Sequence, residues 1–154
     1  MKINFFEKIL GSGFYSGFTK KAPGTVASAF AYLLFFIPGF ENPTFLLLLI
    51  SFLIAFGKDI AEKFEHIYGH DPKECTIDEL IGSFISLLFL PKKIWFIIPA
   101  FLVWRLLDII KPFPANKFDK LSGGWSILLD DIFAGLYTFI IMQLSIMLIN
   151  YFFY

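Results

Sequence analysis

Long runs of apolar residues, separated by short charged stretches, constrain this chain more than any other feature of its sequence. Five apolar segments follow one another along the chain: Val26–Ile37, Phe45–Phe56, Leu80–Leu90, Ile94–Leu107 and Ile132–Tyr154. The last is long enough to cross the hydrocarbon core of a membrane alone, because a crossing helix needs about 20 apolar residues. The other four reach that length only by extending into their polar flanks, or else they stay short, tilted or re-entrant.

The composition favours an integral membrane protein over a soluble one. Hydrophobic residues make up 57% of the 154 residues and charged residues only 17%, whereas a soluble domain has roughly 25% charged residues. The 13 basic and 13 acidic residues cancel, so no excess of positive charge suggests binding to nucleic acid. We therefore expect a single membrane-embedded domain over residues 1–154.

Proline and glycine place turns between the first four segments. Pro38-Gly39 separates the first pair and Pro91 separates the second pair, which predicts two helical hairpins. The sequence thus predicts an all-α fold, an integral membrane bundle of two helical hairpins and a long C-terminal transmembrane helix. Apolar residues within 3–10 predict a short N-terminal interfacial helix, and the pattern of residues 58–68 predicts a separate amphipathic helix.

The predicted hairpins bring the polar stretches 1–25, 57–79 and 108–131 to one side of the membrane. Together with Arg105, this side holds 11 of the 13 Lys and Arg residues and 12 of the 13 acidic residues. Because loops rich in Lys and Arg stay in the cytoplasm, we expect a multi-pass protein whose charged side faces the cytoplasm.

Acidic residues gather where the apolar segments begin or end on this side. Five of them lie at these boundaries: Asp78, Glu79, Asp108, Asp130 and Asp131. Helix capping, or an ion pair of Arg105 with the acid three residues later, accounts for one acid at a time but not for five. Carboxylates packed together repel one another unless a cation lies between them. Hard oxygen ligands in this number suit Mg²⁺.

Basic residues near these acids are candidates for binding phosphate. Arg105 can hold phosphate oxygens with two parallel hydrogen bonds, and Lys111 offers a point charge. Lys21 and Thr25 flank Pro23-Gly24 at the predicted start of the first hairpin, where free backbone N–H groups can bind an anion. The alternative is a capped helix with ordinary interfacial lysines.

Several motifs occur in an order that identifies a resemblance to a known family. The chain resembles the phosphatidylglycerophosphatase A family of bacterial membrane lipid phosphatases. The departures, such as Trp104 and Leu107 where the family usually has Phe, touch no charged position. The motifs that carry the resemblance are Gly11-Ser12-Gly13, Ala22-Pro23-Gly24-Thr25, Asp71-Pro72, residues 78–82 (DELIG), residues 105–114 (RLLDIIKPFP), Gly123-Gly124 and residues 129–135 (LDDIFAG).

The resemblance implies Mg²⁺-dependent hydrolysis of phosphatidylglycerophosphate to phosphatidylglycerol and phosphate, a step of phospholipid biosynthesis at the bacterial inner membrane. The expected partner is the phospholipid substrate, whose acyl chains would lie between the two hairpins. Whether the protein also forms a homo-oligomer is left open by the sequence. We expect the metal ligands to be Asp78, Glu79, Asp130 and Asp131. We expect the catalytic acids to be Asp71, Asp108, Asp130 and Asp131. We expect the phosphate-binding residues to be Arg105, Lys111, Lys21 and Thr25.

The sequence leaves several alternatives open. The attacking group is either a water molecule or the carboxylate of Asp130 or Asp131. Asp71 either protonates the leaving oxygen or simply forms an Asp-Pro turn. Two other functions compete with the phosphatase, namely a lipid-head phosphotransferase and a non-catalytic membrane ion-binding subunit.

Overall fold

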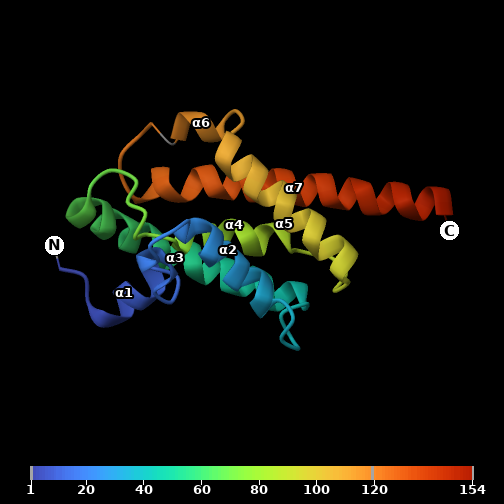
Figure 1. Ribbon diagram of the computed structural model, residues 1–154, viewed down its shortest axis with the longest axis horizontal. Coiled ribbons are helices and arrows are strands. Elements are labelled where there is room, and N and C mark those ends of the chain that lie inside the picture. Colours follow the sequence, from blue (N-terminus) through green and yellow to red (C-terminus); the bar gives the residue numbers. More distant parts are fainter. Residues whose placement is uncertain (1, 119, 154) are drawn as a thin grey trace.

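A computed structural model describes residues 2–118 and 120–153 of the chain, and these residues form an all-helical bundle without strands. The predicted all-α class is therefore confirmed (Figure 1). Tyr154, the last residue of the fifth apolar segment, lies outside the described residues. The elements are α1 (Phe5–Gly11), the 3₁₀ turn η1 (Ser16–Phe18), α2 (Pro23–Leu34), α3 (Pro43–Tyr68), α4 (Ile77–Ser86), α5 (Ile94–Ile110), α6 (Ala115–Phe118) and α7 (Gly124–Phe153).

Helix α4 forms the centre of the bundle and packs against α2, α3, α5 and α7 (Figure 1). Nine of its 10 residues are buried. A helix of this length measures about 15 Å, roughly half the thickness of a hydrocarbon core. The third apolar segment is therefore too short a helix to cross a membrane alone.

Two glycines bring the backbones of α4 and α7 into direct contact. A Cβ atom on Gly135 of α7 would lie 2.6 Å from the carbonyl oxygen of Gly82 in α4, and a Cβ atom on Gly82 would overlap the ring of Trp104. Small residues permit such close approach between membrane helices. Gly82 comes one turn after Asp78 and Gly135 one turn after Asp131, so each glycine shares a helix face with one acid. The glycine contact therefore brings those two acids together.

Helices α3 and α7 are long and apolar enough to cross a membrane, by length and composition. Only 33% and 22% of their most apolar 18-residue windows are buried, whereas the core helix of a soluble protein would be mostly buried. Large hydrophobic side chains such as Leu48 and Leu144 are at least half exposed on them. This exposed apolar surface fits a hydrocarbon environment. The multi-pass topology and its orientation stay predictions.

Helix boundaries differ from the sequence predictions at two places. The second apolar segment and residues 58–68 form the single 26-residue helix α3 rather than two helices, because no proline stops the helix where its polarity changes. Helix α7 begins at Gly124, directly after Gly123 with a positive φ of 104°. Asp130 and Asp131 consequently lie about two turns inside α7 rather than at its start.

The predicted N-terminal helix is present as α1. Asn4 and Glu7 form a capping box at its start, and Glu7 accepts a hydrogen bond from Lys63 of α3 at 2.5 Å. Phe5 and Phe6 are exposed. Contact of these two rings with the membrane interface stays a prediction.

Replacing Gly135 with alanine tests the helix contact. The added methyl group meets backbone atoms of Gly82, which cannot move without shifting α4. We expect Gly135→Ala to lose about 1–3 kcal/mol of the free energy of unfolding, seen as a lower midpoint of thermal unfolding in detergent micelles. Leu144→Ala, on the half-exposed part of the same helix, is the control. Unfolding of Gly135→Ala at the wild-type temperature would contradict the contact.

Candidate active site

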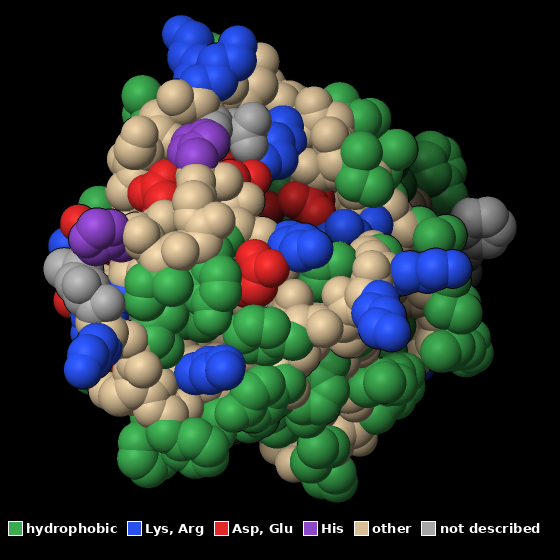
Figure 2. Space-filling model, turned by 60° about the vertical axis from the view of Figure 1, so that its left-hand side comes forward, with side chains coloured by type: hydrophobic (Ala, Val, Ile, Leu, Met, Phe, Trp, Pro, Cys, Tyr) green, Lys and Arg blue, Asp and Glu red, His purple; other side chains and the backbone are tan. Residues whose placement is uncertain are grey.

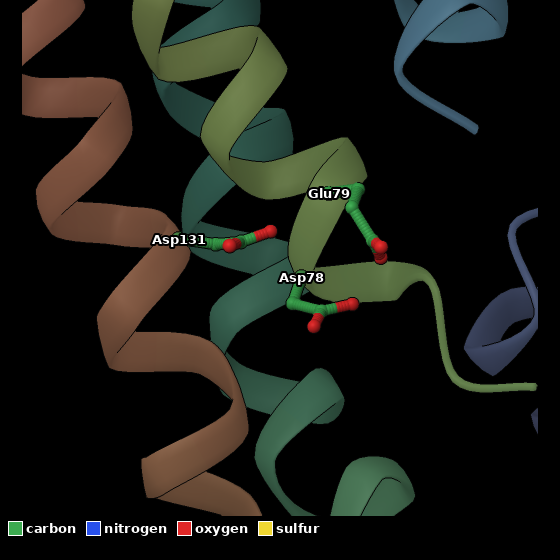
Figure 3. Close-up of side chains that lie close together, drawn as sticks. All are labelled: Asp78, Glu79 and Asp131. Carbon is green, nitrogen blue, oxygen red and sulfur yellow. The ribbon is translucent and has the colours of Figure 1, made fainter. Parts of the chain in front are cut away.

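Three carboxylates converge where the first turn of α4 faces α7 (Figure 3). Asp78 and Glu79 lie in the first turn of α4, and Asp131 reaches toward them from α7. One oxygen from each of the three lies within 4.8 Å of the others, a spacing that could hold a metal ion. The three side chains are called the carboxylate cluster below.

Four carboxylate oxygens at this site are buried without a hydrogen-bond partner: Asp78 Oδ1, Glu79 Oε2, Asp130 Oδ1 and Asp131 Oδ2. A buried polar atom that lacks a partner costs free energy, about 1–3 kcal/mol for a neutral group and more for a charged one. Oxygen ligands of this kind are those that Mg²⁺ and Ca²⁺ prefer. The residues therefore fit a hard divalent cation, although they do not identify which one.

Burial also changes the protonation of the two acids on α4. Burial, together with the negative charges of Asp131 and Asp108, raises the pKa of Glu79 to about 8. Burial raises the pKa of Asp78 well above its usual range, and the neighbouring charge of Glu79 adds to this effect. Without a cation, the protein therefore avoids full ionisation of the cluster.

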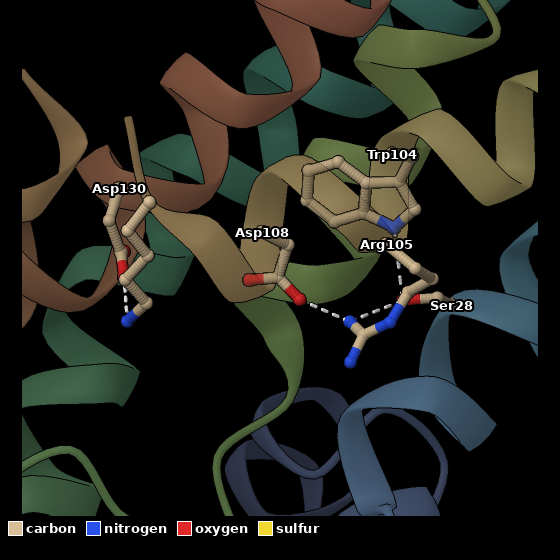
Figure 4. Close-up of polar contacts among 6 residues, drawn as sticks. Ser28, Trp104, Arg105, Asp108 and Asp130 are labelled. Atoms are coloured by element: carbon tan, nitrogen blue, oxygen red, sulfur yellow. Dashed lines mark hydrogen bonds and ion pairs between the residues drawn. The ribbon is translucent and has the colours of Figure 1, made fainter. Parts of the chain in front are cut away.

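Two of the basic residues predicted to bind phosphate belong to the C-terminal part of α5: Arg105 lies inside the helix (Figure 4) and Lys111 is its C-cap. Arg105 donates a hydrogen bond to Asp108 within an ion pair. Lys111, which ends α5 in a left-handed conformation, donates from Nζ to Asp130 Oδ2 at 2.6 Å. The ion pair of Arg105 with Asp108, which the sequence offered as the alternative to a functional role, is thus present.

Asp130 and Asp131 point to different partners although they are neighbours. Successive residues of an α-helix point about 100° apart around the axis. Asp131 accordingly joins the carboxylate cluster, while Asp130 faces Lys111. The role of Asp130 as a metal ligand stays a prediction, and so does that of Asp108 in catalysis.

Ser28 of α2 is a site residue that the sequence does not reveal. It is fully buried, and its Oγ accepts hydrogen bonds from Trp104 Nε1 at 3.1 Å and from Arg105 Nη1 at 3.3 Å (Figure 4). A serine between two alanines in an apolar helix resembles a small packing residue. Only the packing of α2 on α5 gives it a role in holding the guanidinium group.

The start of α2 also approaches the cluster. A Cβ atom on Gly24 would overlap Glu79 Oε1, so glycine permits the first turn of α2 to touch this carboxylate. At the same end of the helix Lys21 is exposed and Thr25 is half-buried. Their binding of phosphate stays a prediction.

Asp71 lies at an exposed turn with a positive φ of 44°. It is near enough that its charge raises the pKa of Asp78. Figure 2 shows charged side chains gathered at this end of the molecule, with some acidic side chains recessed below the surface. Asp71 is thus exposed and close to the carboxylate cluster, and its catalytic role stays a prediction.

Together these features define a helical protein with two membrane-length helices and a site suited to a divalent cation beside an anion. The phosphatidylglycerophosphatase A family model matches residues 9–146. The chain belongs to this family and is a phosphatase. Membership of a lipid phosphatase family and the two apolar helices indicate a membrane protein.

Three relatives match most of the chain. A Bacteroides thetaiotaomicron protein named "Putative phosphatidylinositol-3-phosphatase" is 34% identical, covering 92% of this chain and 94% of its own length. The phosphatidylglycerophosphatase A of Haemophilus influenzae is 33% identical over 87% of this chain and 85% of its own length. The phosphatidylglycerophosphatase A of Escherichia coli is 34% identical over 82% of this chain and 76% of its own length. No solved structure matches significantly.

Metal binding by the carboxylate cluster can be measured without any substrate. A cation that binds only the folded protein at 100 times its dissociation constant stabilises it by about 2.7 kcal/mol. We expect Mg²⁺ or Mn²⁺ to raise the midpoint of thermal unfolding of the wild type but not of Asp131→Asn. The control Asp59→Asn, at an exposed aspartate of α3, should respond like the wild type. Equal stabilisation of all three proteins would exclude the cluster as the binding site.

Proposed function

We propose that this protein hydrolyses the phosphomonoester of phosphatidylglycerophosphate and releases phosphatidylglycerol and inorganic phosphate, with Mg²⁺ as cofactor. The observation that carries the proposal is the set of buried, unpartnered carboxylate oxygens next to Arg105 and Lys111. Two relatives named phosphatidylglycerophosphatase A support this choice of substrate. We place the site at the cytoplasmic face of the bacterial inner membrane.

The carboxylate cluster would hold the metal, with Asp130 as a further ligand. With Mg²⁺ held there, these residues would place positive charge against the phosphate oxygens, whose negative charge it would stabilise. The carboxylate of Asp108 remains paired with Arg105 and orients its guanidinium group. This division leaves separate residues for the metal and for the phosphate.

Arg105 would bind the phosphate group directly. Its Nη1 atom is occupied by Asp108 and Ser28, but its Nε atom is buried without a hydrogen-bond partner. A guanidinium donor fixed on one side and unpartnered on another is prepared for an anion. Lys111 forms an ion pair with Asp130 and contributes a second positive charge to the site.

Asp71 would supply a proton to the leaving glycerol oxygen. It is exposed at the open side of the site, whereas Asp78 and Asp131 are buried. An acid at the surface can exchange its proton with water after each turnover. Asp130 Oδ1, which has no hydrogen-bond partner, would accept the proton of the attacking water. Alternatively it would attack phosphorus itself and displace the glycerol oxygen, and water would then hydrolyse the aspartyl phosphate to release phosphate.

A phosphoinositide is the second candidate substrate, because the Bacteroides thetaiotaomicron relative is named for it. Phosphatidylinositol 3-phosphate also carries a phosphomonoester on a lipid headgroup. The two lipids would use the same metal and the same arginine and would differ in contacts with the headgroup. Parallel assays of both lipids decide between them, and no release from either would favour an ion-binding function.

Phosphate release from lipid in detergent micelles tests the roles of Arg105 and of the divalent cation. Removing a hydrogen bond to a charged group costs about 1.5–3 kcal/mol, which corresponds to roughly a 10- to 100-fold loss in kcat/KM for Arg105→Lys. Chelation of divalent cations should abolish release by the wild type. Undiminished release after chelation, or from Arg105→Lys, would contradict the mechanism.

Ser28→Ala should reduce kcat/KM by removing the hydroxyl that Arg105 Nη1 bonds. If so, the double variant Ser28→Ala/Arg105→Lys is no slower than Arg105→Lys, because both changes remove one interaction. Ser51→Ala is the matched control, since Ser51 is exposed on α3 and bonds only within its own helix. Additive losses in the double variant would show that Ser28 does not act by positioning the arginine.

A further inference from the structure

We propose that the apolar groove between α2 and α5 binds one acyl chain of the lipid whose phosphate reaches Arg105. The groove has a volume of about 270 Å³, and its eight lining residues are Ala29, Tyr32, Leu33, Phe36, Ile94, Ile97, Ile98 and Phe101. It is called the α2–α5 groove below. The identity of the lipid headgroup rests on the proposed function. The groove adds a binding site for the hydrocarbon part of the same lipid.

The α2–α5 groove is continuous with the phosphate site along both of its helices. On α2 it starts at Ala29, directly after Ser28, whose hydroxyl holds Arg105. On α5 it starts at Phe101, one helical turn before Arg105. The polar contact between the two helices therefore ends where the apolar groove begins, which is the arrangement of head and tail in a phospholipid.

The side chains of the groove offer no polar group to a ligand. Tyr32 is the one lining residue with a polar side chain. Its hydroxyl is bonded to Ser86 Oγ of α4 at 2.6 Å, so it is turned into the bundle. The ring of Tyr32 packs edge-to-face on Phe101 at 5.1 Å between centroids. A saturated chain buries apolar surface against such walls without leaving any polar group unsatisfied.

The length of the groove matches one leaflet of a membrane. Its lining residues on α5 extend from Phe101 to Ile94, which are 4 and 11 residues from Arg105. At 1.5 Å per residue, the groove runs from about 6 Å to about 16 Å from the arginine along the helix axis. Half of a hydrocarbon core is about 15 Å. A chain from the headgroup leaflet would fill this depth.

A larger apolar groove, of about 800 Å³, lies between α5 and α7. On α5 it is lined by Trp95, Pro99 and Val103, among others. No residue of α2 lines it. It therefore lies apart from Ser28 and from the α2 side of the phosphate site. Any membrane lipid could occupy this groove, which makes it an internal control for unspecific binding.

Photo-crosslinking locates the acyl chain without requiring turnover. The probe is a diacylglycerol phosphate with a diazirine in the middle of one acyl chain, mixed with the full-length protein in micelles. We expect crosslinks within residues 29–36 and 94–101. An unlabelled diacylglycerol phosphate should suppress them more strongly than an unlabelled phosphatidylcholine does. Crosslinks to residues 141–150 of the α5–α7 groove should be suppressed equally by both competitors.

Two variants narrow the α2–α5 groove from its rim. Leu33→Trp and Ile98→Trp enlarge exposed lining residues and should not disturb the core. Displacing about two methylene groups from the groove should weaken binding of the diacyl lipid about tenfold. Leu102→Trp, an exposed residue of α5 that lines neither groove, should bind like the wild type. A short-chain phosphomonoester should bind all four proteins equally.

The results separate this inference from the proposed function. Crosslinks that depend on the phosphate headgroup support the groove even if no phosphate is released from the lipid. Equal suppression by phosphatidylcholine at residues 29–36 and 94–101 would overturn the groove, even in an active phosphatase. Wild-type affinity of both Leu33→Trp and Ile98→Trp for the diacyl lipid would overturn it as well.

Discussion

The direct contact between α4 and α7 at Gly82 and Gly135 determines the rest of the site. Because neither glycine has a side chain, the short helix α4 lies against the long helix α7 at backbone distance. One turn away on the same faces, Asp78 and Asp131 meet. Longer side chains at the two glycines would separate the helices, and the acids would lie too far apart for one cation. The packing of apolar helices thus sets the geometry of the polar site.

The site places unlike charges in layers at one end of the bundle. The buried carboxylates of α4 and α7 form the inner layer, and Arg105 and Lys111 form the next, each held by an acid. Without bound ligands this arrangement costs free energy of folding, because several buried carboxylate oxygens and the Nε atom of Arg105 have no hydrogen-bond partner. A cation and a phosphate group together would satisfy both sets of atoms. This complementarity is the physical argument for a phosphatase that acts on a membrane lipid.

The sequence was enough to predict the helical class and the convergence of Asp78, Glu79 and Asp131, because apolar runs mark the helices and charged residues mark their polar ends. It placed Asp131 at the start of its helix, whereas this acid lies about two turns inside α7. It divided α3 in two, since a change of polarity at Lys58 marks a change of surroundings and not the end of a helix. It assigned Asp130 and Asp131 to the same metal site; Asp131 does lie in the carboxylate cluster, whereas Asp130 pairs with Lys111 and its role as a ligand stays a prediction. Ser28 could not be found, because its role exists only when α2 packs on α5.

In the proposed mechanism the carboxylate cluster holds a divalent cation within reach of a lipid phosphate. Electron–nuclear double resonance on the Mn²⁺-loaded protein, with a non-hydrolysable phosphonate analogue of the lipid, tests this claim directly. The account predicts a ³¹P hyperfine coupling that is present in the wild type and absent from Asp131→Asn. Bound Mn²⁺ without any ³¹P coupling, or an unchanged coupling in Asp131→Asn, would contradict it.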